Sequence, residues 1–237
     1  MAKPQIKPPY KLSPSGFKFG YENCKRCYYR GIREGLSEPG GFPSVFSKYD
    51  VVHKKSTVGM RTTDLIPDMP EGTFIKGPGD KFLESTNIDC GGNNVGYISG
   101  KGDAFLELDD GSFAVVDFKT SALTKEGALS YSSQLHAYKY ALENNKDNKP
   151  GLSPITKLGI ISFVPDIDLS MKKLKDDIFS IEHKASWFEV PIDDKWFRGY
   201  IEKIIKLIAD ENTPETRPDC KACDYRRCYT QHRSFAR

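Results

Sequence analysis

Runs of apolar residues divide the chain into a small number of expected strands. Residues 155–164 are almost continuously apolar, which is typical of a strand inside a sheet that is covered on both faces. Residues 97–120 contain two shorter apolar runs on either side of an Asp-Asp-Gly sequence at 109–111, and this pattern predicts a hairpin. Residues 178–190 predict a further strand. We expect these strands to form one sheet.

Helical periodicity alternates with the expected strands. A first helix is expected from residue 13, where Ser precedes Pro, because serine caps helix N-termini and proline is tolerated in the first turn. Apolar side chains recur at helical spacing in residues 42–53, 128–143 and 194–208. Residues 56–80 are rich in Thr, Asp, Pro and Gly and predict a loop. The order helix, helix, hairpin, helix, strand, strand, helix predicts an α/β fold with a mixed sheet.

The composition fits one globular domain. The chain has 237 residues, of which 38% are hydrophobic, so it is long enough to bury its own core. We expect residues 1–12, rich in Pro and Lys, to be a flexible leader and residues 13–237 to form a single domain. No long apolar run predicts a membrane span, and no secretory signal opens the chain, so we expect a cytoplasmic protein. The net charge of +3 is too small to indicate nucleic-acid binding by itself.

Two aspartates and a lysine stand at matched positions of the expected hairpin. If Gly111 adopts a left-handed conformation in a three-residue loop, counting back from the loop sets Asp103 directly opposite Asp117. Alternation along the strand puts Asp117 and Lys119 on one face. Facing carboxylates repel each other, and a hard cation such as Mg²⁺ between them removes that repulsion. Lys119 could then polarise a water or phosphate oxygen, which is the chemistry of phosphodiester hydrolysis.

The alternative for this hairpin is a surface element with its charges in water. Aspartate is uncommon in strands, and Asp117 sits in an otherwise apolar run. The helix that follows favours the functional interpretation. Gln134 and Tyr138 lie four residues apart, so they share one helix face and can both reach the end of the strand.

These residues, in this order, carry a family resemblance. Gly-x-x-Asp103, Asp117-x-Lys119-Thr-Ser and Gln134-x-x-x-Tyr138 resemble motifs II, III and QxxxY of the PD-(D/E)xK nucleases. The likeness is closest to the RecB-like branch, which includes the CRISPR-associated and AddB-type iron-sulfur exonucleases. The resemblance implies a restriction-endonuclease-like core, with a mixed central sheet flanked by helices.

The resemblance also implies an activity and its residues. We expect a Mg²⁺- or Mn²⁺-dependent deoxyribonuclease, and more specifically an exonuclease, that acts in DNA repair, recombination or foreign-DNA processing. Asp103 and Asp117 would hold the metal, Lys119 would position the attacking water, and Gln134 and Tyr138 would orient the lysine or contact the nucleic-acid backbone. The expected substrate is DNA that is single-stranded or has free ends, and the expected partners are a helicase or other repair or CRISPR proteins.

Relatives of this type often have an upstream His or Glu as a third metal ligand. His53 and Glu34 are the candidates in this chain, although neither has a motif around it. His136 lies in the helix of Gln134 and Tyr138, and we expect it to pack there or to face solvent.

The cysteines cluster at the two ends of the chain. Cys24 and Cys27 form one CxxC pair, and Cys220 and Cys223 form another, followed by Cys228. Two intervening residues let both thiolates point at one metal. Spacing alone leaves two alternatives: four-cysteine zinc, or a [4Fe-4S] cluster that uses Cys24 or Cys27 and all three C-terminal cysteines.

The resemblance favours the [4Fe-4S] cluster, because the iron-sulfur relatives use one N-terminal cysteine and a C-terminal run of three. Cys24, with Ser13-Pro-Ser15 before it and Tyr28-Tyr29 after it, fits their N-terminal pattern. Cys27 is an additional cysteine, and the gap before Cys228 is short. Cys90 stands apart, and we expect it to be structural.

Basic residues and tyrosines surround both cysteine motifs. If a metal joins the two segments, these residues form either a basic, aromatic surface that suits a nucleic-acid strand or a charged face whose aromatics pack around the metal. Two other functions remain open for the whole chain. One is a non-catalytic nucleic-acid-binding module, against which the intact Asp103, Asp117 and Lys119 argue. The other is a redox or sensing metalloprotein, for which no flavin or nucleotide motif is present.

Overall fold

A computed structural model of the protein describes residues 6–36, 44–78, 81–166 and 172–226. The fold is α/β, with mixed sheets flanked by helices, as the sequence predicts. None of the described helices is long and apolar enough to cross a membrane.

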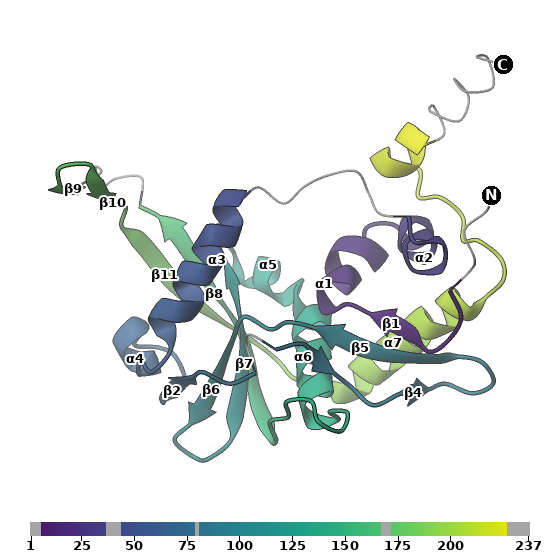
Figure 1. The fold of residues 1–237 in the computed structure, drawn as a ribbon, viewed down its shortest axis with the longest axis horizontal. Coiled ribbons are helices and arrows are strands. Elements are labelled where there is room, and N and C mark those ends of the chain that lie inside the picture. The colour runs from purple at the N-terminus through teal and green to yellow at the C-terminus, as the bar shows by residue number, and fades with distance from the viewer. Residues whose placement is uncertain (1–5, 37–43, 79–80, 167–171, 227–237) are drawn as a thin grey trace.

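A five-stranded mixed sheet forms one end of the molecule (Figure 1). Its strands, in spatial order, are β11 (His183–Val190), β8 (Ile155–Pro165), β7 (Phe113–Lys119), β6 (Ala104–Leu108) and β2 (Gly72–Ile75). β7 and β8 are parallel, and the other neighbours are antiparallel. The apolar run predicted as an internal strand is β8, and the predicted hairpin is β6 and β7.

Alternation along β7 divides the core between the two faces of this sheet. Val115 packs into the cluster that includes α6 (Ser132–Glu143) and α7 (Asp194–Ala209). Val116 and Phe118 pack into a second cluster on the opposite face. Asp117 therefore points from the strand toward the side of the sheet that α6 covers.

A second sheet of short strands lies beside the first. Its centre is β5 (Val95–Gly100), which pairs with β1 (Tyr10–Leu12), β3 (Leu83–Glu84) and β4 (Ile88–Asp89). Tyr10 and Leu12 are almost completely buried. The expected flexible leader of residues 1–12 is therefore too long, because its last residues are part of the core.

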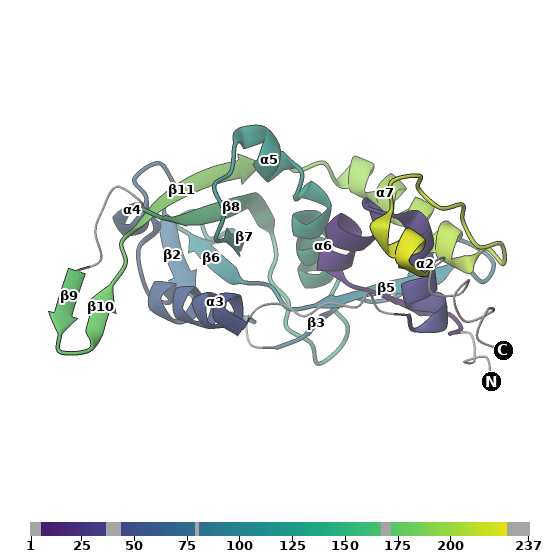
Figure 2. The same ribbon diagram turned by 90° about the horizontal axis from the view of Figure 1, so that it is seen from above.

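The remaining elements surround these sheets. They are α1 (Pro14–Gly16), the π-helical turn η1 (Phe17–Tyr21), α2 (Lys25–Glu34), α3 (Ser44–Thr57), α4 (Thr62–Leu65), α5 (Lys125–Leu129), β9 (Lys172–Lys175) and β10 (Ile178–Ser180). As predicted, Ser13 caps the first helix, whose first residue is Pro14. Figure 1 and Figure 2 show α1, α2 and α7 at one end of the elongated molecule and the five-stranded sheet at the other.

Three predicted boundaries were wrong. Residues 56–80 contain the edge strand β2 and the short α4. β2 forms because it pairs with β6 and buries Phe74, although Pro and Gly residues flank it in the sequence. The predicted helix 128–143 is broken into α5 and α6 at Ser130 and Tyr131. The predicted strand 178–190 consists of β10 and β11 with a break between them.

The loop between β6 and β7 gives a first prediction. Gly111 has φ +82°, and an added Cβ meets no atom within 4 Å, so only the backbone conformation opposes a side chain there. Gly111→Ala should destabilise the protein by about 1–2 kcal/mol, measured by urea unfolding. Gly127→Ala in α5, where the added methyl has ordinary 3.5 Å contacts, should keep or raise the stability. Equal stability of both variants would contradict the proposed loop conformation.

Candidate active site and cysteine cluster

The hairpin register brings Asp103 and Asp117 to adjacent positions. The Leu108 amide donates to the Ser112 carbonyl at 2.8 Å, and Gly111 closes the loop. Ala104 pairs with Val116, so Asp103, which precedes β6, lies beside Asp117. The backbone amide of Phe118 donates to Asp103 Oδ2 at 3.0 Å, which fixes that carboxylate against β7.

Asp117 is the most deeply buried acid of this site, with 1% of its surface exposed. Gln134 Nε2 donates to Asp117 Oδ1 at 2.9 Å and approaches the Tyr138 hydroxyl at 3.3 Å. Burial and the nearby Asp103 carboxylate raise the pKa of Asp117 to about 7. The strand therefore holds a carboxylate whose charged form requires a neighbouring cation.

Lys119 supplies one positive charge beside Asp117. Its ammonium pairs with Asp117 Oδ2, although without a hydrogen bond of ordinary geometry, and lies 4.5 Å from the centre of the Tyr131 ring. Burial opposes protonation of Lys119, but Asp117 outweighs it and raises the pKa of the lysine. Lys119 is therefore a cation at neutral pH. The hydroxyl of Tyr138 stays protonated, because burial raises its pKa far above the usual value.

A second lysine contacts the other carboxylate. Lys54 Nζ lies 2.8 Å from Asp103 Oδ1 and 2.9 Å from Asp50 Oδ2, so one ammonium joins helix α3 to the hairpin. Burial opposes protonation of Lys54, but Asp103 outweighs it and raises the pKa. Asp50 and Lys54 were not predicted as site residues. Both lie within one helical turn of His53, and this proximity is the sequence feature that could have identified them.

His53 and Glu34, the two candidates for an upstream ligand, lie in different places. His53 is buried, stacks on Phe163 with ring centres 4.2 Å apart, and faces the same cavity as the two aspartates. Burial and His183 lower the pKa of His53, which favours the neutral imidazole. Glu34 pairs with Arg30 on α2 at 2.9 Å and does not line this cavity.

These side chains line one open cavity of about 580 Å³. Its lining comes mainly from α3, α6 and the C-terminal end of β7, elements whose arrangement Figure 1 shows. All five predicted catalytic residues line this cavity, and α3 adds two further titratable residues: Asp103, Asp117, Lys119, Gln134, Tyr138, Asp50 and His53. The structure therefore brings together side chains that are separated by more than eighty positions in the sequence.

The donors of this cavity fit a hard divalent cation. Two buried polar atoms, His53 Nδ1 and Gln134 Oε1, have no hydrogen-bond partner in the described part of the chain. Buried polar groups are normally paired, so these atoms are available to a ligand. Together with the carboxylates of Asp103 and Asp117, they form an oxygen-rich donor set of the kind that Mg²⁺ and Mn²⁺ prefer.

His136 does not belong to the cavity. Its Nδ1 lies 2.8 Å from the Ser132 carbonyl, and its Nε2 accepts a hydrogen bond from the Asp193 amide at 2.8 Å. His136 therefore packs between α6 and the start of α7, which is the first of the two predicted alternatives for this residue.

Four cysteines from the two ends of the chain meet in a second cluster. The Sγ atoms of Cys24, Cys27, Cys220 and Cys223 all lie within 4.8 Å of one another. Cys24–Cys223, Cys27–Cys220 and Cys27–Cys223 are separated by 3.8, 3.6 and 3.3 Å. Cys228 lies outside the described residues. Cys90 is half-buried and outside the cluster.

Ionisation of the cluster is uneven. Burial opposes ionisation of Cys24, but hydrogen bonds from the amides of Cys27 and Arg217 outweigh it and lower its pKa to about 7. Burial and the neighbouring sulfurs raise the pKa of Cys27 strongly. Four thiolates are therefore held together only with a cation, as in metal sites.

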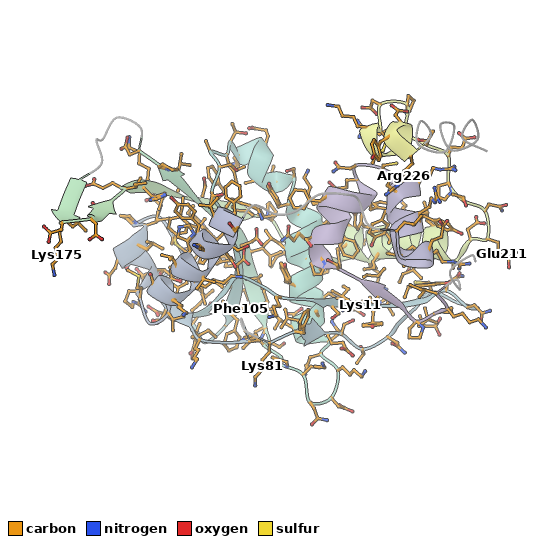
Figure 3. All side chains as sticks on the ribbon, turned by 45° about the horizontal axis from the view of Figure 1, so that its top comes forward. Lys11, Lys81, Phe105, Lys175, Glu211 and Arg226 are labelled. Carbon is orange, nitrogen blue, oxygen red and sulfur yellow. The ribbon has the colours of Figure 1, made fainter. Side chains whose placement is uncertain are left out.

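Two of the tyrosines near the cysteines, Tyr28 and Tyr29, are not part of a stacking surface. Tyr28 and Tyr29 are buried at 8% and 1% exposure, and Arg33 is buried beside them. Tyr225 is exposed, and Arg226, labelled in Figure 3, donates to Cys27 Sγ at 3.3 Å. Tyr28 and Tyr29 therefore pack inside the protein, as the second of the two predicted alternatives for these tyrosines states. Tyr229 lies outside the described residues.

Comparison with known proteins identifies the family. The model of the PD-(D/E)XK nuclease superfamily matches residues 73–228, which include the hairpin, α6 and the C-terminal CxxC pair. The chain therefore belongs to the PD-(D/E)XK nuclease superfamily.

Other comparisons add little detail. No curated protein sequence matches the chain. Among solved structures, the chain is similar to one titled "Crystal structure of SSO0001", with 18% identity and a TM-score of 0.41 over 88% of this chain and 80% of the other. The family assignment rests on the sequence match.

The amide of Gln134 gives a second prediction. Gln134→Met keeps the side-chain volume but leaves buried Asp117 Oδ1 without its amide donor, which should cost about 1–3 kcal/mol. The measurement is urea unfolding in the presence of a chelator. Tyr138→Phe, which removes a hydroxyl that is hydrogen-bonded to Gln134 and leaves the bond from Gln134 to Asp117 in place, should cost less. If both variants lose the same stability, the bond to Asp117 is not what Gln134 contributes.

Proposed function

We propose that the protein is a divalent-metal-dependent deoxyribonuclease of the RecB-like branch of its superfamily. One observation carries the proposal: Asp103, Asp117 and Lys119 converge in an open cavity whose donors fit Mg²⁺ or Mn²⁺. The superfamily implies a nucleic-acid substrate. The Gln134-x-x-x-Tyr138 motif, which contacts Asp117 through Gln134, supports the RecB-like branch.

Each side chain of the cavity has a proposed role. Asp103, Asp117 and His53 would hold the metal, which when bound polarises the scissile phosphate and lowers the pKa of a water. Lys119 places its ammonium where negative charge develops on the phosphate, and it orients the attacking water. Gln134 holds Asp117 in position through its amide. Tyr138 contacts that amide, which limits the rotation of Gln134.

The proposed function includes a reaction and a setting. We propose that the chain forms one domain that acts as an exonuclease on DNA with a single-stranded region or a free end. The enzyme would act in repair, recombination or foreign-DNA processing in the cytoplasm, with a helicase or similar protein as partner. A non-catalytic binding module would need no lysine beside a buried aspartate. The Asp117–Lys119 pair therefore favours catalysis.

The third prediction tests the catalytic residues. Asp117→Asn and Lys119→Met should each lower Mg²⁺- or Mn²⁺-dependent cleavage of end-labelled linear DNA by roughly a hundredfold or more, the scale expected when one group that stabilises transition-state charge is lost. Mg²⁺ should also raise the melting temperature of the wild type but not of Asp117→Asn, because binding to the native state stabilises it.

Asp109→Asn is the matched control, because Asp109 lies on the loop of the same hairpin and half of its side chain is exposed. It should cleave at the wild-type rate. Circular DNA separates exonuclease from endonuclease activity. Full cleavage by Asp117→Asn would refute the assignment.

For the cysteine cluster, we propose one zinc ion with a structural role. A tetrahedral zinc site with Zn–S bonds near 2.3 Å separates its sulfurs by about 3.8 Å. Three of the sulfur pairs here are 3.3–3.8 Å apart, and all lie within 4.8 Å. In a [4Fe-4S] cluster each thiolate binds a different iron, so the cluster itself holds the sulfurs farther apart. The distances therefore favour zinc over the cluster that the resemblance implies.

The surroundings of the cluster support a structural role. Arg26 donates to the Pro214 carbonyl at 3.1 Å, and Arg217 donates to the Asn23 carbonyl at 3.2 Å, so the same two segments are also joined by hydrogen bonds. Thiolates select soft metals rather than the hard cation that hydrolysis uses. The cluster would therefore contribute to the free energy of folding rather than to catalysis.

The fourth prediction concerns this metal. Protein purified without added metal should be colourless and contain one zinc per chain. Cys223→Ser should lose the zinc and melt at a lower temperature. Cys90→Ser, a substitution outside the cluster, should retain both the zinc and the melting temperature. Brown protein that contains iron would instead establish the iron-sulfur alternative.

A further inference from the structure

A second groove begins where the candidate active site ends. It has a volume of about 680 Å³ and lies between α3 on one side and β2 and β6 on the other. Asp103 lines both this groove and the catalytic cavity, so the two spaces adjoin at a proposed metal ligand. Whatever occupies the groove therefore lies directly beside the reacting group.

The walls of the groove carry uncompensated positive charge. Lys55 on α3 and Lys76 at the end of β2 are both exposed, and neither forms an ion pair with another described residue. Lys54 also lines the groove, but its charge is shared by Asp50 and Asp103. Asp103 is the only acid among the described residues that line it. The rim therefore attracts an anion.

Most of the remaining lining is apolar. Val51 and Val58 of α3 are about half exposed, at 48% and 44%, whereas Phe74 and Phe105 of the sheet are almost completely buried beneath the groove. Figure 3 shows Phe105 close to α3. An occupant with both apolar rings and a repeated negative charge matches such a surface. A nucleic-acid strand has this chemistry, since its phosphates pair with lysines and its sugars and bases cover apolar side chains.

We propose that this groove binds the single nucleic-acid strand next to the scissile phosphate, and that Lys55 and Lys76 contact its phosphates. The proposal rests on the proposed nuclease function, because that function places the reacting phosphate at Asp103 and Asp117. The volume of the groove, about 680 Å³, lies in the range of ligand-binding clefts, roughly 300–1,000 Å³. Binding there depends on charge and is independent of base sequence.

The test is fluorescence anisotropy with a labelled oligothymidylate, in buffer without Mg²⁺ or Mn²⁺, so that no hydrolysis occurs and the cysteine-bound metal is retained. Lys55→Ala and Lys76→Ala should each weaken the affinity several-fold. Each should also reduce the slope of log Kd against log salt by about 0.7, the value for one phosphate contact on a single strand. Lys55→Arg and Lys76→Arg, which keep the charge, should bind nearly as tightly as the wild type.

Lys175→Ala is the control, because Lys175 is exposed on β9 at the far end of the molecule (Figure 3). It should keep the wild-type affinity and salt slope. The melting temperature of every variant establishes that it is folded. A folded double variant, Lys55→Ala with Lys76→Ala, that binds with unchanged affinity and slope would overturn the proposal. A loss no larger than that of Lys175→Ala would do the same.

The experiments distinguish a wrong assignment of the groove from a wrong assignment of the nuclease function. If the wild type cleaves DNA while the double variant binds normally, only the groove is refuted. If the wild type cleaves nothing with Mg²⁺ or Mn²⁺, the proposed function is refuted, and the strand-binding role that depends on it falls as well.

Discussion

The burial of one carboxylate organises the catalytic half of this protein. Asp117 sits inside a sheet where an unpaired charge is strongly disfavoured. Lys119 of the same strand and Gln134 of α6 stabilise the charged form, whereas the nearby Asp103 carboxylate at the start of the hairpin opposes it. The packing of α6 over β7 therefore provides the hydrogen bond to Asp117, and the register of the hairpin creates the carboxylate pair whose repulsion a cation would relieve.

The half of the molecule that contains the cysteine cluster is held together by different interactions. α2 and the C-terminal segment are joined by the cysteine cluster and by side-chain bonds to the backbone, such as the Tyr29 hydroxyl to the Asp210 carbonyl. In Figure 2, the yellow segment at residues 220–226 lies beside α2, although nearly two hundred positions separate them. A metal at this point would join these two distant segments of the chain.

The sequence predicted the parts of the fold that depend on local chemistry. Gly111, the alternation along β7 and the four-residue spacing of Gln134 and Tyr138 sufficed to predict the hairpin and the shared cavity. The sequence did not reveal β1 or β2, because short strands at sheet edges depend on partners that are distant in the chain. It also could not choose between His53 and Glu34, or show Lys54 between two acids, because those contacts depend on where α3 docks. Whether these residues catalyse hydrolysis remains a prediction.

The ion pair between Lys54 and Asp103 has a thermodynamic consequence. Asp103 is shared between an ammonium on α3 and the place proposed for a metal, so any cation that draws on this carboxylate competes with Lys54. By linkage, binding of that cation and docking of α3 through Lys54 weaken each other, and each does so by the same free energy. Helix α3 also forms a wall of both cavities. The occupancy of the metal position and the shape of the surrounding surface therefore form one coupled equilibrium.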